Sequence, residues 1–285
     1  MPVHPLSHLP STVLALRRAG CVFAEEEARL LHEAAASVDE LSSLVERRAA
    51  GLPLEHVLGW ADFRGRRFVV DAGVFVPRRR TEFLVAQAAA LAPGRAVVVD
   101  LCCGSGALGA ALASASDTAE LHACDVEPAA VRCARRNIGD LGHVYEGDLF
   151  APLPVTLRGR VDVLLANVPY VPSDDVELLP AEARVHEPRV ALDGGGDGLD
   201  LMRRVAAEAP RWLAPGGSLL VEASERQRDT AGDILRAAGL SPRVLVSEEL
   251  YATVLVGTVP AGAAEQSGIP PWGDPAAAPN GPAQD

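Results

Sequence analysis

The stretch "VVVDLCCGSGALGAALA", residues 97–113, decides the fold because it joins a strand, a glycine-rich turn and a helix. Its first five residues are almost all apolar, which is typical of a strand that is covered on both faces of a parallel sheet. Small residues in the turn allow a ligand to approach the backbone, and the helix N-terminus offers unpaired N–H groups. The stretch therefore predicts the first unit of a β/α domain with a ligand site at the turn.

The rest of the chain continues the β/α alternation. We expect seven strands, over residues 96–101, 121–126, 144–149, 161–167, 217–224, 243–250 and 251–259. Helical patterns follow the first two strands, and another, over 197–213, precedes the fifth. Apolar strands that alternate with helices predict a mainly parallel, Rossmann-like α/β sheet with helices on both faces.

The segment before this domain has a different pattern. Helices are expected over residues 11–20, 24–37 and 38–51, and alternation around Gly65 predicts a hairpin within 63–76. The end of the chain is rich in proline and lacks apolar periodicity. We therefore predict a helical unit with a hairpin over 1–75, the α/β domain over 76–259 and a disordered tail over 260–285.

Composition narrows the class of protein. The chain has 285 residues, of which 48% are hydrophobic and 22% are charged, as in ordinary globular proteins. No apolar run reaches the roughly 18 residues of a membrane span, and the first residues do not resemble a signal peptide. Five cysteines without a C-x-x-C pair predict reduced thiols in the cytoplasm and no metal site. A net charge of −12 disfavours direct binding of nucleic acid.

The glycine turn is compatible with two cofactors. Gly104, Gly106 and Gly109 satisfy G-x-G-x-x-G, and Asp125, at the end of the second strand, is placed to bind ribose hydroxyls. This pattern alone fits a nicotinamide-dependent dehydrogenase.

Two further acids favour S-adenosylmethionine (AdoMet). Asp100 lies directly before the turn, where a carboxylate disfavours a pyrophosphate but suits a ligand with ammonium and sulfonium groups. Asp148, after the third strand, is placed to meet the exocyclic amine of an adenine. AdoMet is therefore the expected cofactor.

The fourth strand ends in a polar motif, "ANVPYVPS", residues 166–173. One interpretation is a plain turn, since Asn and Pro are common where strands end. The other is a site for a planar NH2 group. The Asn167 side-chain oxygen and the Val168 carbonyl would each accept one N–H, Pro169 would stiffen the turn, and Tyr170 would supply a flat wall.

Seven stretches, in this order, carry a family resemblance: "LPLEHVLGWADFRG", "VPRRRTEFLV", "DLCCGSGALG", "CDVEPAAVRCARRN", "GDLF", "ANVPYVPS" and "EPRVALDGGGDGLDLMRRV". Over roughly residues 10–258 the chain resembles the HemK family of protein-glutamine N-methyltransferases. The resemblance implies a class I AdoMet-dependent methyltransferase fold behind a small helical domain that helps to recognise the protein substrate. It implies methylation of a glutamine side chain of a protein, the Gly-Gly-Gln glutamine of a peptide-chain release factor being the expected target.

The resemblance also assigns roles to residues. Asn167, Val168, Pro169 and Tyr170 hold the glutamine. The expected cofactor-binding residues are Asp100, Cys102, Cys103, Gly104, Ser105, Gly106, Asp125, Asp148, Leu149 and Asn167.

This sequence departs from the family pattern at two places. Val168 replaces the first proline of N-P-P-Y, and Arg79 and Arg80 replace the proline and the acid of P-R-P-[DE]-T-E. Two alternatives stay open: an N-methyltransferase of the same fold that acts on DNA or RNA, and a protein that binds AdoMet without catalysis. We also expect Arg78 and Glu82 to form a structural ion pair.

Overall fold

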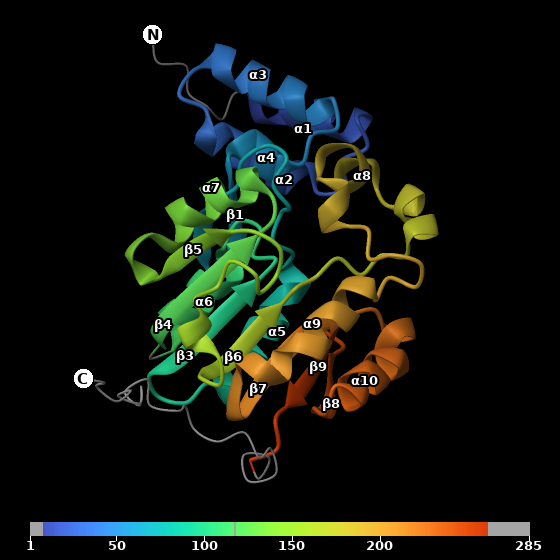
Figure 1. Ribbon diagram of the computed structural model, residues 1–285. Coiled ribbons are helices and arrows are strands. Elements are labelled where there is room, and N and C mark those ends of the chain that lie inside the picture. The colour runs from blue at the N-terminus through green and yellow to red at the C-terminus, as the bar shows by residue number, and fades with distance from the viewer. Residues whose placement is uncertain (1–7, 117, 262–285) are drawn as a thin grey trace, which may run out of the picture.

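A seven-stranded sheet forms the centre of the computed structural model, which describes residues 8–116 and 118–261 (Figure 1). The strand order is β5-β4-β3-β6-β7-β9-β8, and β9 alone runs antiparallel to the others. The strands are β3 (Ala96–Leu101), β4 (Thr118–Asp125), β5 (His143–Glu146), β6 (Val161–Ala166), β7 (Leu213–Ala223), β8 (Ser241–Ser247) and β9 (Ala252–Thr258). The predicted α/β class and the seven strands are confirmed.

Helices cover both faces of the sheet, as the apolar strands require. One face packs against α5 (Glu82–Leu91), α6 (Ala107–Ala115) and α7 (Pro128–Ile138), and the other against α9 (Asp200–Trp212) and α10 (Arg228–Ala237). Successive side chains of β3 point to opposite faces of the sheet. Val98 packs into the core beneath α5, α6 and α7, whereas Val99 packs into the core beneath α9 and α10.

Four helices and then a hairpin open the described part of the chain; the helices lie at the top of Figure 1, and the hairpin strand β1 (Trp60–Phe63) lies below them. The helices are α1 (Leu9–Arg18), α2 (Ala24–Ala34), α3 (Val38–Ala49) and α4 (Leu54–Leu58), and they share a small core of their own. Strands β1 and β2 (Arg66–Val69) pair antiparallel around Gly65, which confirms the predicted hairpin. The short α4 and α8 (Ala181–His186) were not predicted, and neither was α5.

The division of the chain near residue 75 stays a prediction. The disordered tail over 260–285 also stays a prediction, because all but its first two residues lie outside the described part. Within the described residues, no helix is long and apolar enough to cross a membrane.

The strand order places a crevice at one edge of the sheet. Strands β4 and β5 lie on one side of β3, whereas β6 and β7 lie on the other. The chain therefore leaves the carboxyl ends of β3 and β6 in opposite directions, which opens the crevice where ligands bind in open α/β sheets. The glycine turn follows β3 and the N-V-P-Y motif follows β6, so both predicted motifs meet at this crevice.

Candidate active site

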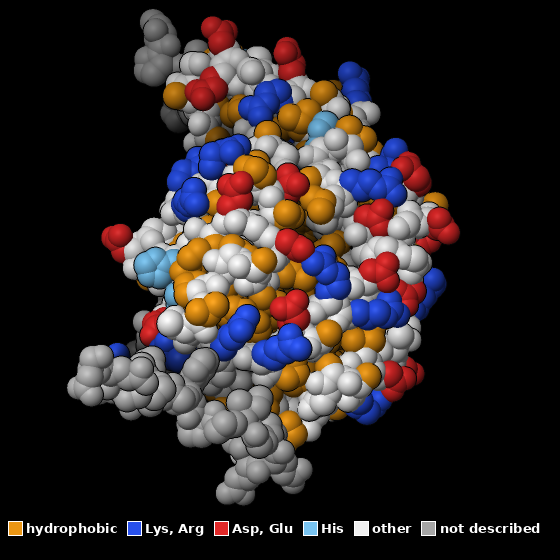
Figure 2. Space-filling model, in the orientation of Figure 1, with side chains coloured by type: hydrophobic (Ala, Val, Ile, Leu, Met, Phe, Trp, Pro, Cys, Tyr) orange, Lys and Arg blue, Asp and Glu red, His pale blue; other side chains and the backbone are white. Residues whose placement is uncertain are grey.

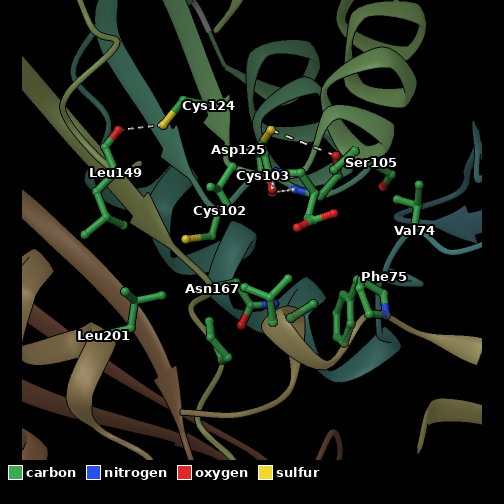
Figure 3. Close-up of a pocket in the computed structure, with 18 of the residues that line it drawn as sticks. Val74, Phe75, Cys102, Cys103, Ser105, Cys124, Asp125, Leu149, Asn167 and Leu201 are labelled. Atoms are coloured by element: carbon green, nitrogen blue, oxygen red, sulfur yellow. Dashed lines mark hydrogen bonds between the residues drawn. The ribbon is translucent and has the colours of Figure 1, made fainter. Parts of the chain in front are cut away.

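A cavity of about 410 Å³ occupies the crevice (Figure 3). Segment 73–77, which follows the hairpin, forms part of its wall through Val74 and Phe75. Most of the predicted site residues line it: Cys102, Cys103, Gly104, Ser105, Asp125, Asp148, Leu149, Asn167 and Pro169.

The glycine turn has the backbone that its sequence suggested. Gly104 has φ +55°, and a Cβ there would meet nothing within 4 Å, so this backbone is open to a ligand. Gly106 has φ +76° and does not line the cavity, because a Cβ there would lie only 3.0 Å from Cβ of Ala134 on α7. Gly106 therefore permits the close packing of α6 on α7.

Cys102 lies in the same turn with φ +53°, a left-handed conformation that is uncommon for residues other than glycine. Its sulfur lies at the cavity wall (Figure 3). Burial raises the pKa of the Cys102 and Cys103 thiols well above the ordinary value, so both stay protonated and neither is an activated nucleophile.

Asp125 holds the turn in place. Its Oδ2 accepts the Gly104 N–H at 2.8 Å, and its Oδ1 accepts the Glu127 N–H at 2.9 Å. Burial raises the pKa of this carboxyl, although the two backbone N–H groups act in the opposite direction. Each oxygen keeps a further lone pair for a hydroxyl group of a ligand.

Asp148 faces Arg204 of α9 across the cavity mouth, with Nη2 and Oδ2 2.5 Å apart. Both side chains are half-exposed, so the ion pair is a weak constraint that a ligand can displace. Arg204 was missed in the sequence because nothing in its helix distinguishes it from other surface arginines.

The prediction that Asp100 contacts the ligand needs correction. Asp100 is 1% exposed and does not line the cavity. Strand alternation directs it towards α6, where its Oδ2 accepts the Gly109 N–H at 2.9 Å. Its Oδ1 is buried without a hydrogen-bond partner among the described residues, and burial raises the pKa of the carboxyl to about 7. Asp100 thus ties β3 to the first turn of α6 beneath the glycine turn.

Asn167 carries an unpaired acceptor at the cavity wall. Its Oδ1 is buried and has no hydrogen-bond partner within the described part of the chain. The side chain projects into the cavity (Figure 3). Leaving a buried acceptor unpaired costs about 1–3 kcal/mol, so each such group in a folded protein needs an explanation. A ligand that donates an N–H here would supply the partner.

A second, smaller cavity of about 40 Å³ lies beyond Asn167. It shares Phe75, Asn167, Pro169 and Ala191 with the larger cavity, and the two are therefore neighbours. The remaining motif residues, Val168 and Tyr170, face this smaller cavity and not the larger one.

A hydrogen-bonded network lines the smaller cavity. Glu222 of β7 is buried, and its Oε1 accepts both the Tyr170 hydroxyl at 2.7 Å and Arg80 Nε at 2.8 Å. Its Oε2 accepts the Thr81 hydroxyl at 2.7 Å. Arg80 Nη2 also donates to the Tyr170 hydroxyl at 2.6 Å. Burial, with Glu222 nearby, raises the pKa of Tyr170, so the phenol remains a neutral donor.

One local signal of this network is present in the sequence. Glu222 interrupts the apolar run "SLLVEA", and an acid inside a buried strand needs a partner. Arg80 is distinguished in the sequence only as a departure from the family pattern.

The predicted ion pair between Arg78 and Glu82 is wrong. Arg78 pairs with Glu187, whose other oxygen accepts the Val76 N–H at 3.2 Å. Glu82 accepts the Arg64 N–H at 2.9 Å instead. Because Glu187 follows α8, its two bonds fix segment 73–77 against the loop on the other side of the site.

Comparison with known proteins agrees with this geometry. The family "Methyltransferase small domain" matches residues 65–199. The release factor glutamine methyltransferase of Deinococcus radiodurans is 36% identical over 261 residues, which cover 83% of this chain and 91% of that protein. The enzyme of the same name from Streptomyces coelicolor is 41% identical and covers 65% of this chain and 67% of that protein. With the Geobacter sulfurreducens relative the identity is 42% and the match spans 66% of each chain.

A solved ribosomal protein L11 methylase from Lactobacillus delbrueckii is also similar, at 13% identity and a TM-score of 0.48, over 64% of this chain and 80% of that chain.

The sheet order, the glycine turn and the cavity at the switch point define a class I AdoMet-dependent methyltransferase fold. Within that class, the chain belongs to the release factor glutamine methyltransferase family.

Proposed function

We propose that the protein transfers a methyl group from AdoMet to the side-chain amide nitrogen of a glutamine in a protein, and that this protein is a translation release factor methylated at Gly-Gly-Gln. The observation that carries the proposal is the buried, unpaired Oδ1 of Asn167 at the wall that separates the two cavities. A primary amide is a ligand that satisfies this acceptor.

The residues of the larger cavity fit AdoMet. Gly104 leaves open backbone, Asp125 keeps lone pairs for the ribose hydroxyls, and Phe75, Leu149 and Leu201 supply apolar surface for the adenine. Asp125 and Asp148 give the cavity a negative character that suits a cationic ligand. When bound, AdoMet supplies an electrophilic methyl group.

The protein's own residues address the difficulty of amide chemistry. A carboxamide nitrogen is a poor nucleophile because its lone pair is delocalised into the carbonyl. Asn167 Oδ1 and the Val168 carbonyl accept its two N–H groups and thus orient the nitrogen and stabilise the charge that develops on it. Tyr170, held by Glu222 and Arg80, forms a fixed side of the smaller cavity for a planar group.

The N-terminal helices are proposed to help recognise the protein substrate. Arg48 of α3 is buried, pairs with Glu27 of α2 at 2.6 Å, and also reaches Glu182 of α8 at 2.7 Å. This contact fixes the helical unit to α8, directly before Glu187 and the site loop. The unit is therefore held beside the site, where a large substrate would meet it.

Surface charge gives no support to a nucleic-acid substrate. On the face in Figure 2, basic and acidic side chains are interspersed, and the net charge of the chain is −12. A backbone of phosphates requires a continuous basic surface.

One experiment tests the proposal and its rivals together. The purified protein is incubated with labelled AdoMet and, separately, a bacterial release factor, DNA and RNA, and the products are analysed by mass spectrometry. Label on the release-factor glutamine is expected. Label only in nucleic acid would overturn the substrate, and no transfer despite AdoMet binding would leave a non-catalytic binding protein. Calorimetry with NADH in place of AdoMet tests the nicotinamide alternative.

A further inference from the structure

The smaller cavity is lined by hydrogen-bonding groups of both kinds. Asn167 presents an unpaired acceptor. Arg80 also lines the cavity, and its guanidinium carries only donors. A volume of about 40 Å³ admits a small planar group and little else.

Arg80 is held in a fixed orientation and still has donors to spare. Its Nε donates to Glu222 at 2.8 Å and its Nη2 to the Tyr170 hydroxyl at 2.6 Å. A guanidinium has five N–H groups, and among the described residues the other three of Arg80 have no hydrogen-bond partner. The side chain is 44% exposed and also lines an outer groove with Tyr251, so Arg80 borders both that groove and the smaller cavity.

A bound carboxamide needs a group that distinguishes its oxygen from its nitrogen. The two atoms are nearly the same size, so an amide rotated by a half-turn about its Cγ–Cδ bond fits the same space. Two acceptors on the nitrogen side disfavour the rotated form, and a donor on the oxygen side disfavours it further.

We propose that Arg80 is a specificity-determining residue that donates a hydrogen bond to the carbonyl oxygen of the target glutamine. The inference rests on the proposed function. As the nitrogen–methyl bond forms, the carbon–sulfur bond breaks and sulfur keeps the electron pair. The nitrogen then loses one proton to water, which restores the neutral amide. The guanidinium therefore acts on how the amide binds and is oriented, through its hydrogen bond to the carbonyl oxygen.

Arg78 is the other cation that lines the smaller cavity, but its guanidinium already has partners. It pairs with the buried Glu187 and lies over the Phe75 ring at 4.8 Å. Both contacts serve to hold segment 73–77, so we assign the oxygen contact to Arg80.

The simpler role for Arg80 is support of Tyr170 through Glu222, and a loss of rate in Arg80→Ala would fit that role too. A double-mutant cycle distinguishes this support from a direct contact with the substrate oxygen. A release factor is assembled by ligation of a synthetic Gly-Gly-Gln peptide whose glutamine carries either its amide or a thioamide. Sulfur accepts hydrogen bonds weakly, and the other changes that it makes to the glutamine are the same in every variant, so they cancel in the cycle.

The expected result is coupling between the two changes. In the wild-type protein the thioamide should lower kcat/KM for N-methylation by about tenfold, the effect of losing a hydrogen bond to a charged group. In Arg80→Ala that thioamide effect should shrink to less than about twofold, because the donor is gone. Arg79→Ala is the matched control, since Arg79 is exposed, lines neither cavity and should keep the wild-type thioamide effect.

Equal thioamide effects in the wild type and Arg80→Ala would overturn the inference and leave Arg80 as a support for Tyr170. Coupling at Arg78→Ala with none at Arg80→Ala would likewise overturn it. If the wild-type protein does not methylate the unmodified release factor at all, the proposed function fails instead, so the two failures are distinguishable.

Discussion

Replacement of Asn167 by alanine should lower the methyl-transfer rate without lowering the free energy of unfolding, because the Asn167 side chain serves the site and does not stabilise the fold. Asn167 makes no side-chain hydrogen bond with the described residues, and its Oδ1 is a buried orphan. Removing such an acceptor recovers part of a penalty of about 1–3 kcal/mol, against a small loss of packing. The free energy of unfolding of the ligand-free protein should therefore rise by about 1 kcal/mol, or about 2–4 °C in Tm for a domain of this size.

The methyl-transfer rate should fall in the same variant. Loss of one preorganised hydrogen bond to the reacting group costs about 100- to 1,000-fold in rate. AdoMet binding should be nearly unchanged, because Asn167 is only one of many residues around the larger cavity. Asn167→Asp keeps an acceptor and should retain more of the rate than alanine.

The assays are urea denaturation of the ligand-free protein and single-turnover transfer to the release factor. Asn137→Ala is the matched control for stability. Asn137 Oδ1 accepts the Val69 N–H at 2.8 Å, and its Nδ2 donates to the Val69 and Ser105 carbonyls at 2.8 Å each. Its loss should lower the free energy of unfolding by about 2–4 kcal/mol. If Asn167→Ala were destabilised like Asn137→Ala and transferred methyl groups at the wild-type rate, Asn167 would be a structural turn residue and the reasoning would fail.

Three further predictions concern the same edge of the sheet. Val168→Pro should transfer at close to the wild-type rate in the same assay, because the carbonyl is kept and the Val168 N–H donates no hydrogen bond in this loop; a loss like that of Asn167→Ala contradicts this. Asp125→Ala should weaken AdoMet binding by about 1.5–3 kcal/mol in calorimetry, and unchanged affinity would remove Asp125 from the binding site. Burial raises the pKa of Asp100 from 3.8 to about 7, so its stabilising contribution is fully present below about pH 4 and is lost as pH rises through about 7. Between these pH values the free energy of unfolding should therefore fall by about 4 kcal/mol in urea titrations, and Asp100→Asn should abolish that fall. An unaltered pH profile in the variant would show that Asp100 ionises normally.

The helices and strands of the fold were largely predictable from the sequence, but the order of the strands in the sheet was not. Apolar runs such as residues 96–101 and 161–167 identified the strands, because burial on both faces leaves a continuous signature. No local sequence pattern indicates that β6 lies beside β3, because that adjacency is set by packing between distant segments. The start of β7 at Leu213 was missed because "LAPGG" has the proline and glycines of a turn, and α4 and α8 are too short to show a period.

The site was predictable at positions where the backbone geometry requires particular residue types. The glycine turn and the end of β6 are recognisable because small residues, or a polar residue at a strand end, are needed at fixed places. Asp100 could not be placed, since one step along a strand decides whether a side chain faces a ligand or a helix. The partnership of Arg80 with Glu222 had no local signature, because the two residues meet only through the tertiary fold.

The two buried side-chain oxygens that lack a partner among the described residues lie where the sheet itself cannot satisfy them. Asp100 of β3 stands beside Leu165 of β6 in the register, and Asn167 follows two residues later, so both orphaned oxygens lie at the ends of the two strands that flank the switch point. The chain turns away from this edge in opposite directions, and no further strand can supply partners there. The two oxygens differ in depth, however: Asp100 is sealed beneath the glycine turn, whereas Asn167 opens on both cavities. Only the cost at Asn167 can therefore be relieved by a ligand, and the stability given up there becomes binding free energy for a substrate group that carries two N–H donors in a plane, as a primary amide does.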